Sequence, residues 1–241
     1  MGMGEHRRLL PAGLLCRNFS LMRITLIHAM APSISPIEDA FRRLWPEATL
    51  MNLLDDSLAS DLAADGALTP AMTSRFLALA RYAVSTGSDA ILFTCSAFGP
   101  CIEACAAEFP TIPVLKPNEA MIEEALALTG PRGRIGLMAT FAPTLASMPP
   151  EFAVAAPDAT LTPCLAEGAL AALNAGDGAG HDAAAVRAAA ALADCDVIAL
   201  AQFSLSRAAG PVAAATGKTV LTTPDSAVRK LRHLLLQAKA A

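Results

Sequence analysis

The sequence repeats itself, and this duplication limits the possible folds more than any other feature. The segment DAILFTCS at residues 89–96 recurs in the second half as DVIALAQF at residues 196–203. Each copy consists of an acidic residue, an apolar run typical of a buried strand, and a polar residue at the carboxyl end of that strand. Upstream, RITLI at 23–27 is followed by APS, and RIGLM at 134–138 is followed by APT at the same spacing. We therefore expect two similar structural units.

Apolar, β-branched runs alternate with helical patterns through both copies, and several helical patterns open with proline or close with glycine. Strands are expected at residues 21–29, 49–54, 90–94, 112–115, 134–139, 160–163, 197–201 and 219–221. Helices are expected from Pro36, over 70–86, 100–107 and 117–128, after Pro143, over 181–193 and 206–215, and from Pro224. This alternation predicts parallel sheets with right-handed crossovers.

The fold class predicted is α/β, with two pseudo-symmetric domains, each a parallel sheet flanked by helices, and an active-site cleft between them. The sequence GPRG at residues 130–133 is the clearest break. We expect domains at residues 23–130 and 131–222, and a C-terminal helix over 223–241 that packs back on the first domain. Residues 1–22 show no pattern that matches the repeat and are expected to be a disordered extension.

Composition excludes several classes of partner. Only 17% of the 241 residues are charged and the net charge is −4, so no basic field is present to bind nucleic acid. The 54% hydrophobic content comes largely from alanine, with no apolar run of about 18 residues, so no membrane partner is expected. Six cysteines without a secreted spacing pattern favour a reducing compartment, and hence the cytoplasm.

Cys95 stands where a strand ends and a turn leads to the next helix at Gly99. Ligands of open α/β sheets bind outside the carboxyl ends of the strands, and a helix start favours anions. A free thiol has a pKa of about 8.5. Because the helix start favours the thiolate, it is expected to lower the pKa of Cys95 and make it a base or nucleophile. The alternative is a cysteine that only fills space in the core. Gln202 is its counterpart and is expected to face it across the cleft.

Metal binding is not expected. Cys101 and Cys105 share a helix face near Cys95, which would give three soft ligands. Structural zinc needs a fourth ligand and usually C-x2-C spacing, and neither is found here.

His28 ends the first strand and is expected to point into the same cleft as Cys95. A histidine there can act as an acid, a base or a carboxylate binder, and a hydrogen-bonded core histidine is the open alternative. His6, His181 and His233 are expected at the surface.

The order and spacing of several segments resemble the aspartate/glutamate/hydantoin racemase superfamily, which includes maleate isomerases and arylmalonate decarboxylases. The resemblance covers residue 22 to the C-terminus. Its landmarks are RITLI at 23–27, TCSA at 94–97, NEAMIEEA at 118–125, RIGLMAT at 134–140 and the strand that ends at Gln202.

The resemblance implies an enzyme without cofactor or metal that acts at the α-carbon of a small carboxylate and assembles as a homo-oligomer, a dimer in relatives. Cys95 matches the first of the two cysteines that exchange the α-proton in the racemases, and Gln202 replaces the second. An amide cannot transfer protons near neutral pH. Residues implied in substrate binding are Pro32, Ser33, Ser96, Ala97, Thr140, Phe203 and Ser204.

Three functional hypotheses follow. In the first, Cys95 and Gln202 form a modified isomerase site, with His28 or a water as the missing acid. In the second, Cys95 alone protonates an enolate, as the single cysteine of the decarboxylases does. In the third, the site binds a small carboxylate without catalysis. Gln202 donates a hydrogen bond to a carboxylate or enolate oxygen in the first two, or only caps backbone groups.

Overall fold

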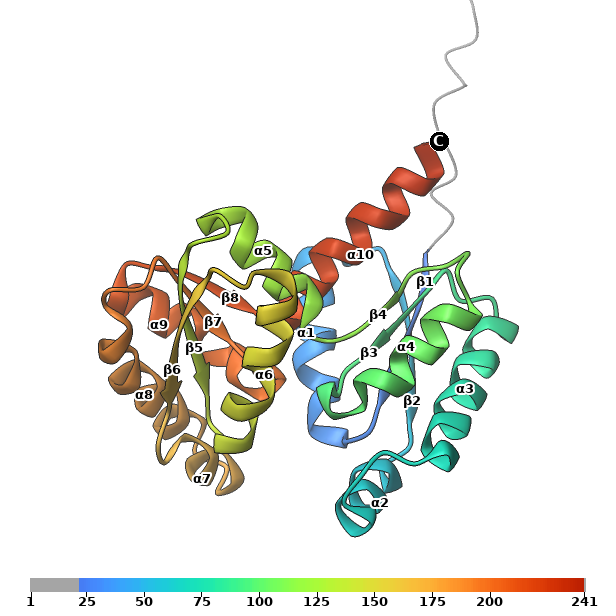
Figure 1. The fold of residues 1–241 in the computed structure, drawn as a ribbon, viewed down its shortest axis with the longest axis horizontal. Coiled ribbons are helices and arrows are strands. Elements are labelled where there is room, and N and C mark those ends of the chain that lie inside the picture. Colours follow the sequence, from blue (N-terminus) through green and yellow to red (C-terminus); the bar gives the residue numbers. More distant parts are fainter. Residues whose placement is uncertain (1–21, 241) are drawn as a thin grey trace, which may run out of the picture.

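Two four-stranded parallel sheets, one in each half of the chain, form the framework of the computed structural model, which describes residues 22–240 (Figure 1). The strands are β1 (Arg23–His28), β2 (Thr49–Leu54), β3 (Ala90–Phe93), β4 (Val114–Leu115), β5 (Arg134–Ala139), β6 (Thr160–Leu165), β7 (Val197–Leu200) and β8 (Thr219–Thr222). The sheet orders are β2-β1-β3-β4 and β6-β5-β7-β8, so both halves have the same topology. The predicted fold class is confirmed.

Helices flank both sheets (Figure 1). The α-helices are α1 (Ile34–Leu44), α2 (Ser57–Asp65), α3 (Pro70–Ser85), α4 (Gly99–Glu108), α5 (Glu119–Thr129), α6 (Ala142–Ala155), α7 (Ala169–Asn174), α8 (Gly178–Ala189), α9 (Ala209–Thr216) and α10 (Thr223–Ala240). Short 3-10 helices are η1 (Ala31–Ser33), η2 (Ser96–Phe98), η3 (Ala190–Leu192) and η4 (Phe203–Ala208). The sequence patterns did not predict α2 and α7. At α3, Pro70 occupies the first turn and the Thr69 hydroxyl accepts the Met72 N–H at 3.3 Å, as the start signal implied.

The duplicated sequence pattern makes the same contact between an aspartate and an arginine backbone in both halves of the structure. The Asp89 carboxylate accepts the N–H of Arg23 at 2.7 Å, and the Asp89 N–H donates to the Arg23 carbonyl at 2.8 Å. Asp196 makes the same two contacts with Arg134, at 2.9 and 2.7 Å. We call these two contacts the strand-start pairs. Each sets the register between the two central strands of its sheet.

Each half of the molecule has in its core a helix from the other side of the break at residues 130–133. Met121, Ile122 and Ala125 of α5 pack in the core around β5 and β7, although α5 precedes the break at residue 130. Val228 and Leu231 of α10 pack in the core of the first half. Each core therefore contains side chains from both sides of the break, which ties the two halves together by packing.

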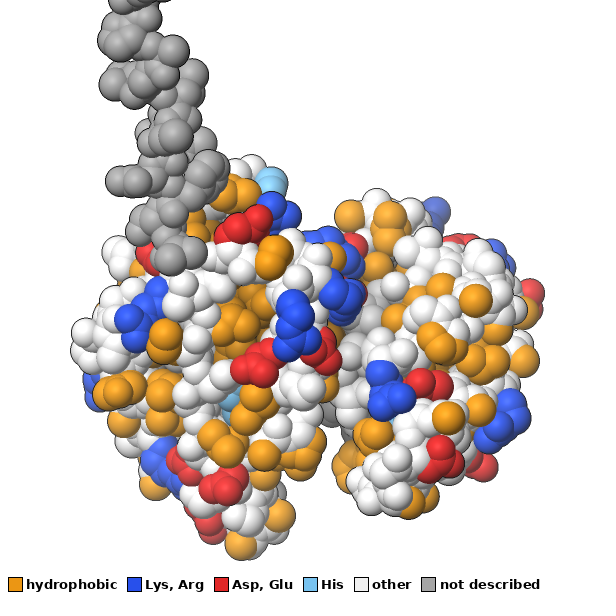
Figure 2. Space-filling view, turned by 180° about the vertical axis from the view of Figure 1, so that it is seen from behind, with side chains coloured by type: hydrophobic (Ala, Val, Ile, Leu, Met, Phe, Trp, Pro, Cys, Tyr) orange, Lys and Arg blue, Asp and Glu red, His pale blue; other side chains and the backbone are white. Residues whose placement is uncertain are grey.

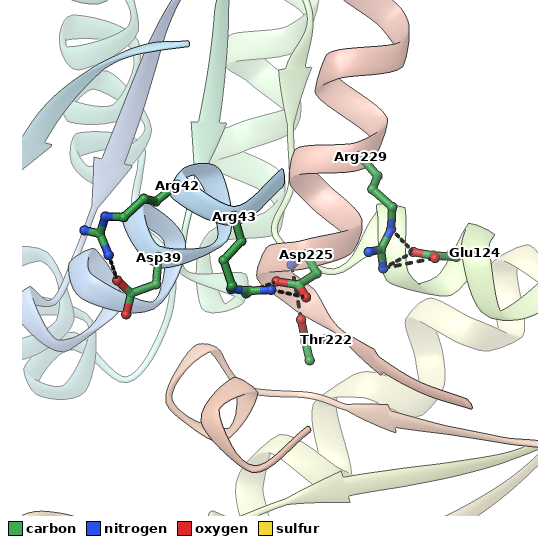
Figure 3. Close-up of polar contacts among 7 residues, drawn as sticks. All are labelled: Asp39, Arg42, Arg43, Glu124, Thr222, Asp225 and Arg229. Carbon is green, nitrogen blue, oxygen red and sulfur yellow. Dashed lines mark hydrogen bonds and ion pairs between the residues drawn. The ribbon is translucent and has the colours of Figure 1, made fainter. Parts of the chain in front are cut away.

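Ion pairs accompany α10 where it lies across α1 and beside α5 (Figure 3). Arg43 of α1 contacts Asp225 at 2.7 Å, and Arg229 contacts Glu124 of α5 at 3.0 Å. The Asp225 N–H also donates to the Thr222 hydroxyl at 3.2 Å. Exposed ion pairs contribute little individually, so the apolar side of α10 supplies most of its attachment.

The beginning of the described chain is already part of the core. Met22, which the prediction placed in the N-terminal extension, is buried, and its carbonyl accepts the Thr49 N–H at 2.8 Å. The rest of the predicted extension, residues 1–21, lies outside the described residues. No helix within residues 22–240 combines the length and the apolar character that crossing a membrane requires.

His181 corrects one prediction from the sequence. It was expected at the surface, but its side chain on α8 is fully buried, and its Nδ1 lies 2.8 Å from a carboxylate oxygen of Asp182. The alanine-rich helix carries its small side chains on most faces, so the sequence pattern does not show which face packs inward. His233, in contrast, is exposed as expected.

Candidate active site

Cys95 is the second residue after the carboxyl end of β3 and has an extended backbone, with η2 beginning at the next residue. Its side chain is half-buried and packs on the apolar cluster that contains Phe76 and Phe93. Burial raises the pKa of the Cys95 thiol, and a hydrogen bond from the Ala97 backbone N–H lowers it only in part. The direction is opposite to the expected lowering, because desolvation outweighs the single N–H donor. The thiol is therefore protonated at neutral pH.

Gln202 occupies the matching position after β7 in the second half. Its side-chain oxygen accepts two hydrogen bonds from Thr140, one from the backbone N–H at 2.6 Å and one from the hydroxyl at 2.9 Å. These contacts fix the amide with Oε1 toward Thr140. The Nε2 group, with its two N–H donors, points away from Thr140. The structure thus brings together Thr140 and Gln202, which the sequence placed at the ends of different strands.

His28 is fully buried at the end of β1 and has partners on both ring nitrogens. Nε2 lies 2.9 Å from Oδ1 of Asn52, and Nδ1 lies 2.9 Å from the Thr94 hydroxyl and 3.0 Å from the Ser33 hydroxyl. Burial lowers the pKa of His28, and the Asn52 hydrogen bond and the charge of Glu38 oppose this only in part. The geometry is that of a neutral, hydrogen-bonded core histidine.

The second half has no equivalent of this histidine cluster. In the duplicated pattern His28 corresponds to Ala139, and Thr94 corresponds to Ala201. Both alanines are buried. Of the paired strand-end positions, only Cys95 has a titratable side chain that is partly exposed.

A cavity of about 540 Å³ lies between the two halves and brings together Pro32 of η1 and Ser204 of η4, two of the residues predicted to bind substrate. The space-filling view shows a furrow between the halves, with basic and acidic side chains close together near its upper part (Figure 2). The volume of the cavity falls in the range of small-molecule sites. The other lining residues are Ser35, Pro36, Asp39, Arg43, Leu173, Ser206, Arg207, Ala209, Gly210 and Asp225.

The remaining predicted binding residues fall into different surroundings. Ser96 and Ala97 are exposed in η2, directly beside Cys95. Ser33 contacts His28. Phe203 is buried in the core of the first half, although it belongs to the second half of the sequence. Its position indicates that it joins the two halves by packing.

Cys101 and Cys105 of α4 are buried in the same apolar core as Phe76. The Cys101 sulfur lies 3.4 Å from the Thr73 hydroxyl, and burial raises the pKa of Cys105 to about 12. A thiol with so high a pKa is unreactive near neutral pH. Within the part of the chain that the structure describes, no three His, Cys, Asp or Glu side chains are grouped to hold a metal ion.

Taken together, two parallel α/β halves of identical topology, with polar residues at matching strand ends, define a duplicated α/β fold with its candidate site at those ends. A family model described as Asp/Glu/Hydantoin racemase matches residues 34–231. The chain belongs to this family.

Solved structures share the fold at low sequence identity. Allantoin racemase from Klebsiella pneumoniae has a TM-score of 0.68 at 18% identity, over 90% of this chain and 89% of the other. A glycine-to-cysteine mutant of arylmalonate decarboxylase in a sulfate-associated form scores 0.64 at 19% identity, over 88% and 93%. Glutamate racemase from Francisella tularensis with D-glutamate scores 0.63 at 14% identity, over 90% and 82%. A comparison with curated protein sequences finds no match.

Proposed function

We propose that the protein is a cofactor-independent enzyme of the racemase and isomerase type. It forms a carbanion or enolate at the α-carbon of a small carboxylate and uses Cys95 as its acid–base group. The observation that carries the proposal is the asymmetry of the two strand ends. Cys95 follows β3 and Gln202 follows β7, so one strand end has a thiol and the matching strand end has an amide.

The two residues have different chemical roles. The Cys95 thiol gives a proton to the α-carbon, or its thiolate removes one. Gln202 cannot transfer a proton, but its Nε2 donors are held in place because Thr140 fixes the amide oxygen. A fixed donor stabilises negative charge on a carboxylate or enolate oxygen as it develops. Ser96 is exposed beside Cys95, and its hydroxyl is a further donor for the substrate carboxylate.

In the isomerase reaction the Cys95 thiolate removes the α-proton, and the C–H electron pair moves into the enolate. The resulting thiol returns a proton to the same face of the α-carbon. Inversion requires a proton from the opposite face, where Gln202 cannot supply one and water is the only donor. Exchange with solvent is therefore expected to be faster than racemization.

A decarboxylase reaction is the second candidate, and the raised pKa of Cys95 favours it. The bond between the α-carbon and one carboxylate of a malonate-type substrate breaks, carbon dioxide leaves, and its bonding electron pair becomes the enolate. The Cys95 S–H then protonates the α-carbon, and the thiolate regains a proton from water. A thiol that is already protonated at neutral pH is suited to this step.

The experiment incubates the enzyme in D2O with amino acids, hydantoins including allantoin, maleate and arylmalonates, and follows α-deuterium by NMR and carbon dioxide release. Activity on at least one substrate is expected, with a loss of about a thousandfold in Cys95→Ser and little change in Cys164→Ala. Equal activity of Cys95→Ser and the natural protein would contradict the assignment. No turnover of any substrate, with measurable carboxylate binding, would favour the binding-only hypothesis.

The assembly and location of the protein are also proposals. The family resemblance favours a homodimer, which sedimentation velocity would show as a single species of twice the chain mass. A monomer at micromolar concentration would contradict it. The cysteine pattern favours the cytoplasm, and fractionation of cells that express the full chain would test this.

A further inference from the structure

A chain of hydrogen bonds runs from helix α1 to the residue before Cys95. Glu38 of α1 accepts from Nδ2 of Asn52 at 2.7 Å, and Oδ1 of Asn52 lies 2.9 Å from Nε2 of His28. On the other side of the ring, Nδ1 lies 2.9 Å from the Thr94 hydroxyl. The fully buried His28 stands in the middle of this chain, with Asn52 exposed at one side.

The first part of the chain determines which ring nitrogen of His28 carries a proton. A carboxylate only accepts hydrogen bonds, so Glu38 requires that the Asn52 amide turn its NH2 group toward it. The amide oxygen of Asn52 therefore faces Nε2 and can only accept there. Nε2 must carry the hydrogen, and in the neutral ring Nδ1 is then an acceptor.

The second part of the chain determines the direction of a hydroxyl. Ser33 has one hydroxyl proton, and we assign it to the Met30 carbonyl at 2.8 Å because Nδ1 of His28 is farther away, at 3.0 Å. In this arrangement the donor to Nδ1 of His28 is the hydroxyl of Thr94, the residue before Cys95. That hydroxyl also lies 2.8 Å from the Ser33 hydroxyl and 3.4 Å from the Ile27 carbonyl. The Thr94 side chain is thereby fixed against β1, which orients the turn that presents Cys95.

We propose that His28 is a positioning residue, whose neutral Nε2–H form is selected by Glu38 through Asn52 and holds the Thr94 hydroxyl so that Cys95 is correctly oriented. The catalytic consequence rests on the proposed function, because it needs Cys95 to be the acid–base group. The protonation pattern of the ring does not rest on it. The first hypothesis from the sequence, in which His28 supplies the missing acid, predicts a different outcome in each measurement below.

The first measurement is the long-range 1H–15N spectrum of the histidine rings in the full chain, with His28 assigned by its absence in His28→Gln. The neutral Nε2–H form is expected at pH 7. Glu38→Gln removes the acceptor-only partner, so Asn52 can turn and the Nδ1–H form should become populated. Glu47→Gln, an exposed change of the same charge between α1 and β2, should leave the spectrum unchanged. A charged ring or the Nδ1–H form in the natural protein overturns the proposal.

The second measurement is the rate at which Cys95 reacts with iodoacetamide, which needs no substrate. Thr94→Val keeps the shape of the side chain but removes the hydroxyl, and His28→Leu removes the ring that holds it. Both should change the rate about fivefold or more, with Glu47→Gln as the control. Circular dichroism verifies that each variant is folded. Unchanged rates in a folded Thr94→Val overturn the proposal even if the ring has the expected form.

The third measurement uses whichever substrate the exchange experiment identifies. His28→Leu should lower kcat about tenfold with a smaller change in KM. His28→Gln keeps one hydrogen-bond donor and one acceptor, so it should retain most of the kcat of the natural protein. The pH limbs of kcat/KM should be the same in all three proteins. Loss of a limb in His28→Gln would show that His28 itself transfers a proton and overturn the proposal. An inactive natural protein that passes the first two measurements would reject the proposed function and leave the positioning role intact.

Discussion

The two strand-end regions of this molecule have the same backbone plan and unequal chemistry. The first presents His28, Thr94 and Cys95, and the second has alanine at the first two of these positions and Gln202 at the third. The first region holds its turn through a hydroxyl bonded to an imidazole, and the second through an amide oxygen bonded to Thr140. The two turns are thus anchored by different means, and only one keeps a group that transfers protons.

The other end of the strands shows the opposite behaviour. The strand-start pairs, Asp89 with Arg23 and Asp196 with Arg134, make the same backbone contacts in both halves. Contacts that set strand register are the same in the two halves, while the carboxyl ends, where ligands bind in such folds, differ. The comparison separates the residues that set the strand register from those to which we propose a chemical role.

The largest effect is expected when the first region is made like the second. Cys95→Gln gives both strand ends an amide and removes the only thiol there, so exchange and carbon dioxide release should fall by about a thousandfold or more. The variant should remain folded, because Cys95 is only half-buried. Activity is measured by NMR in D2O and folding by circular dichroism. Residual activity within about tenfold of the natural protein would mean that another group carries the reaction.

The reverse change makes the second region like the first. Gln202→Cys places a thiol on both sides of the site, so the rate of inversion should rise about tenfold relative to the rate of α-exchange. Chiral chromatography gives the inversion rate, and NMR gives the exchange rate. Gln202→Ser, which breaks the same Thr140 contacts without adding a strong acid, is the matched control. An equal rise in both variants would attribute the effect to the loosened turn.

Much of the framework could be predicted from the sequence because local patterns encode it. The strands around Cys95 and Gln202 are short apolar runs bounded by polar residues, and the duplication aligns their ends. Helix α2 was missed because its start has only Asp56 and Ser57 as signals and its apolar stripe is weak. Its end at Gly66, with a φ of 69°, is a stop signal that could have indicated it.

The rest depends on contacts between distant segments. Nothing local to Asn52 or Glu38 predicts that Asn52 contacts His28 or that Glu38 contacts Asn52, because the pairing of β2 beside β1 and the packing of α1 create these contacts. The pKa of Cys95 was predicted in the wrong direction for the same reason. The sequence shows the helix start near the thiol, but the burial that outweighs it comes from α3 residues such as Phe76.

A smaller effect is expected in the pH dependence of Cys95 alkylation. Because burial raises the pKa of this thiol, its reactive thiolate should appear only above the range of ordinary thiols, about pH 8.5. At pH 7 the rate constant should be severalfold below that of a small free thiol of ordinary pKa. Mass spectrometry of the labelled peptide follows the reaction, and an accelerated reaction at pH 7 would show that the environment favours the thiolate.

The smallest effect on activity is expected at the strand-start pairs. Asp89→Ala leaves the Arg23 N–H without its partner in a half-buried site, which should lower the free energy of unfolding by about 1 kcal/mol. Asp196→Ala should lower it less, because Asp196 is exposed. Urea denaturation measures both, and kcat should not change. A loss of kcat in either variant would mean that these pairs also shape the site.

The stereochemistry of α-exchange in the natural protein decides whether the two regions are chemically unequal. A single enantiomer of an identified substrate is incubated in D2O, and deuterium incorporation and enantiomeric purity are followed in the same sample. With Cys95 on one side and Gln202 on the other, deuterium should enter with retention, and racemization should be about tenfold slower than exchange. Equal rates of exchange and racemization would show that a second proton donor already acts opposite Cys95.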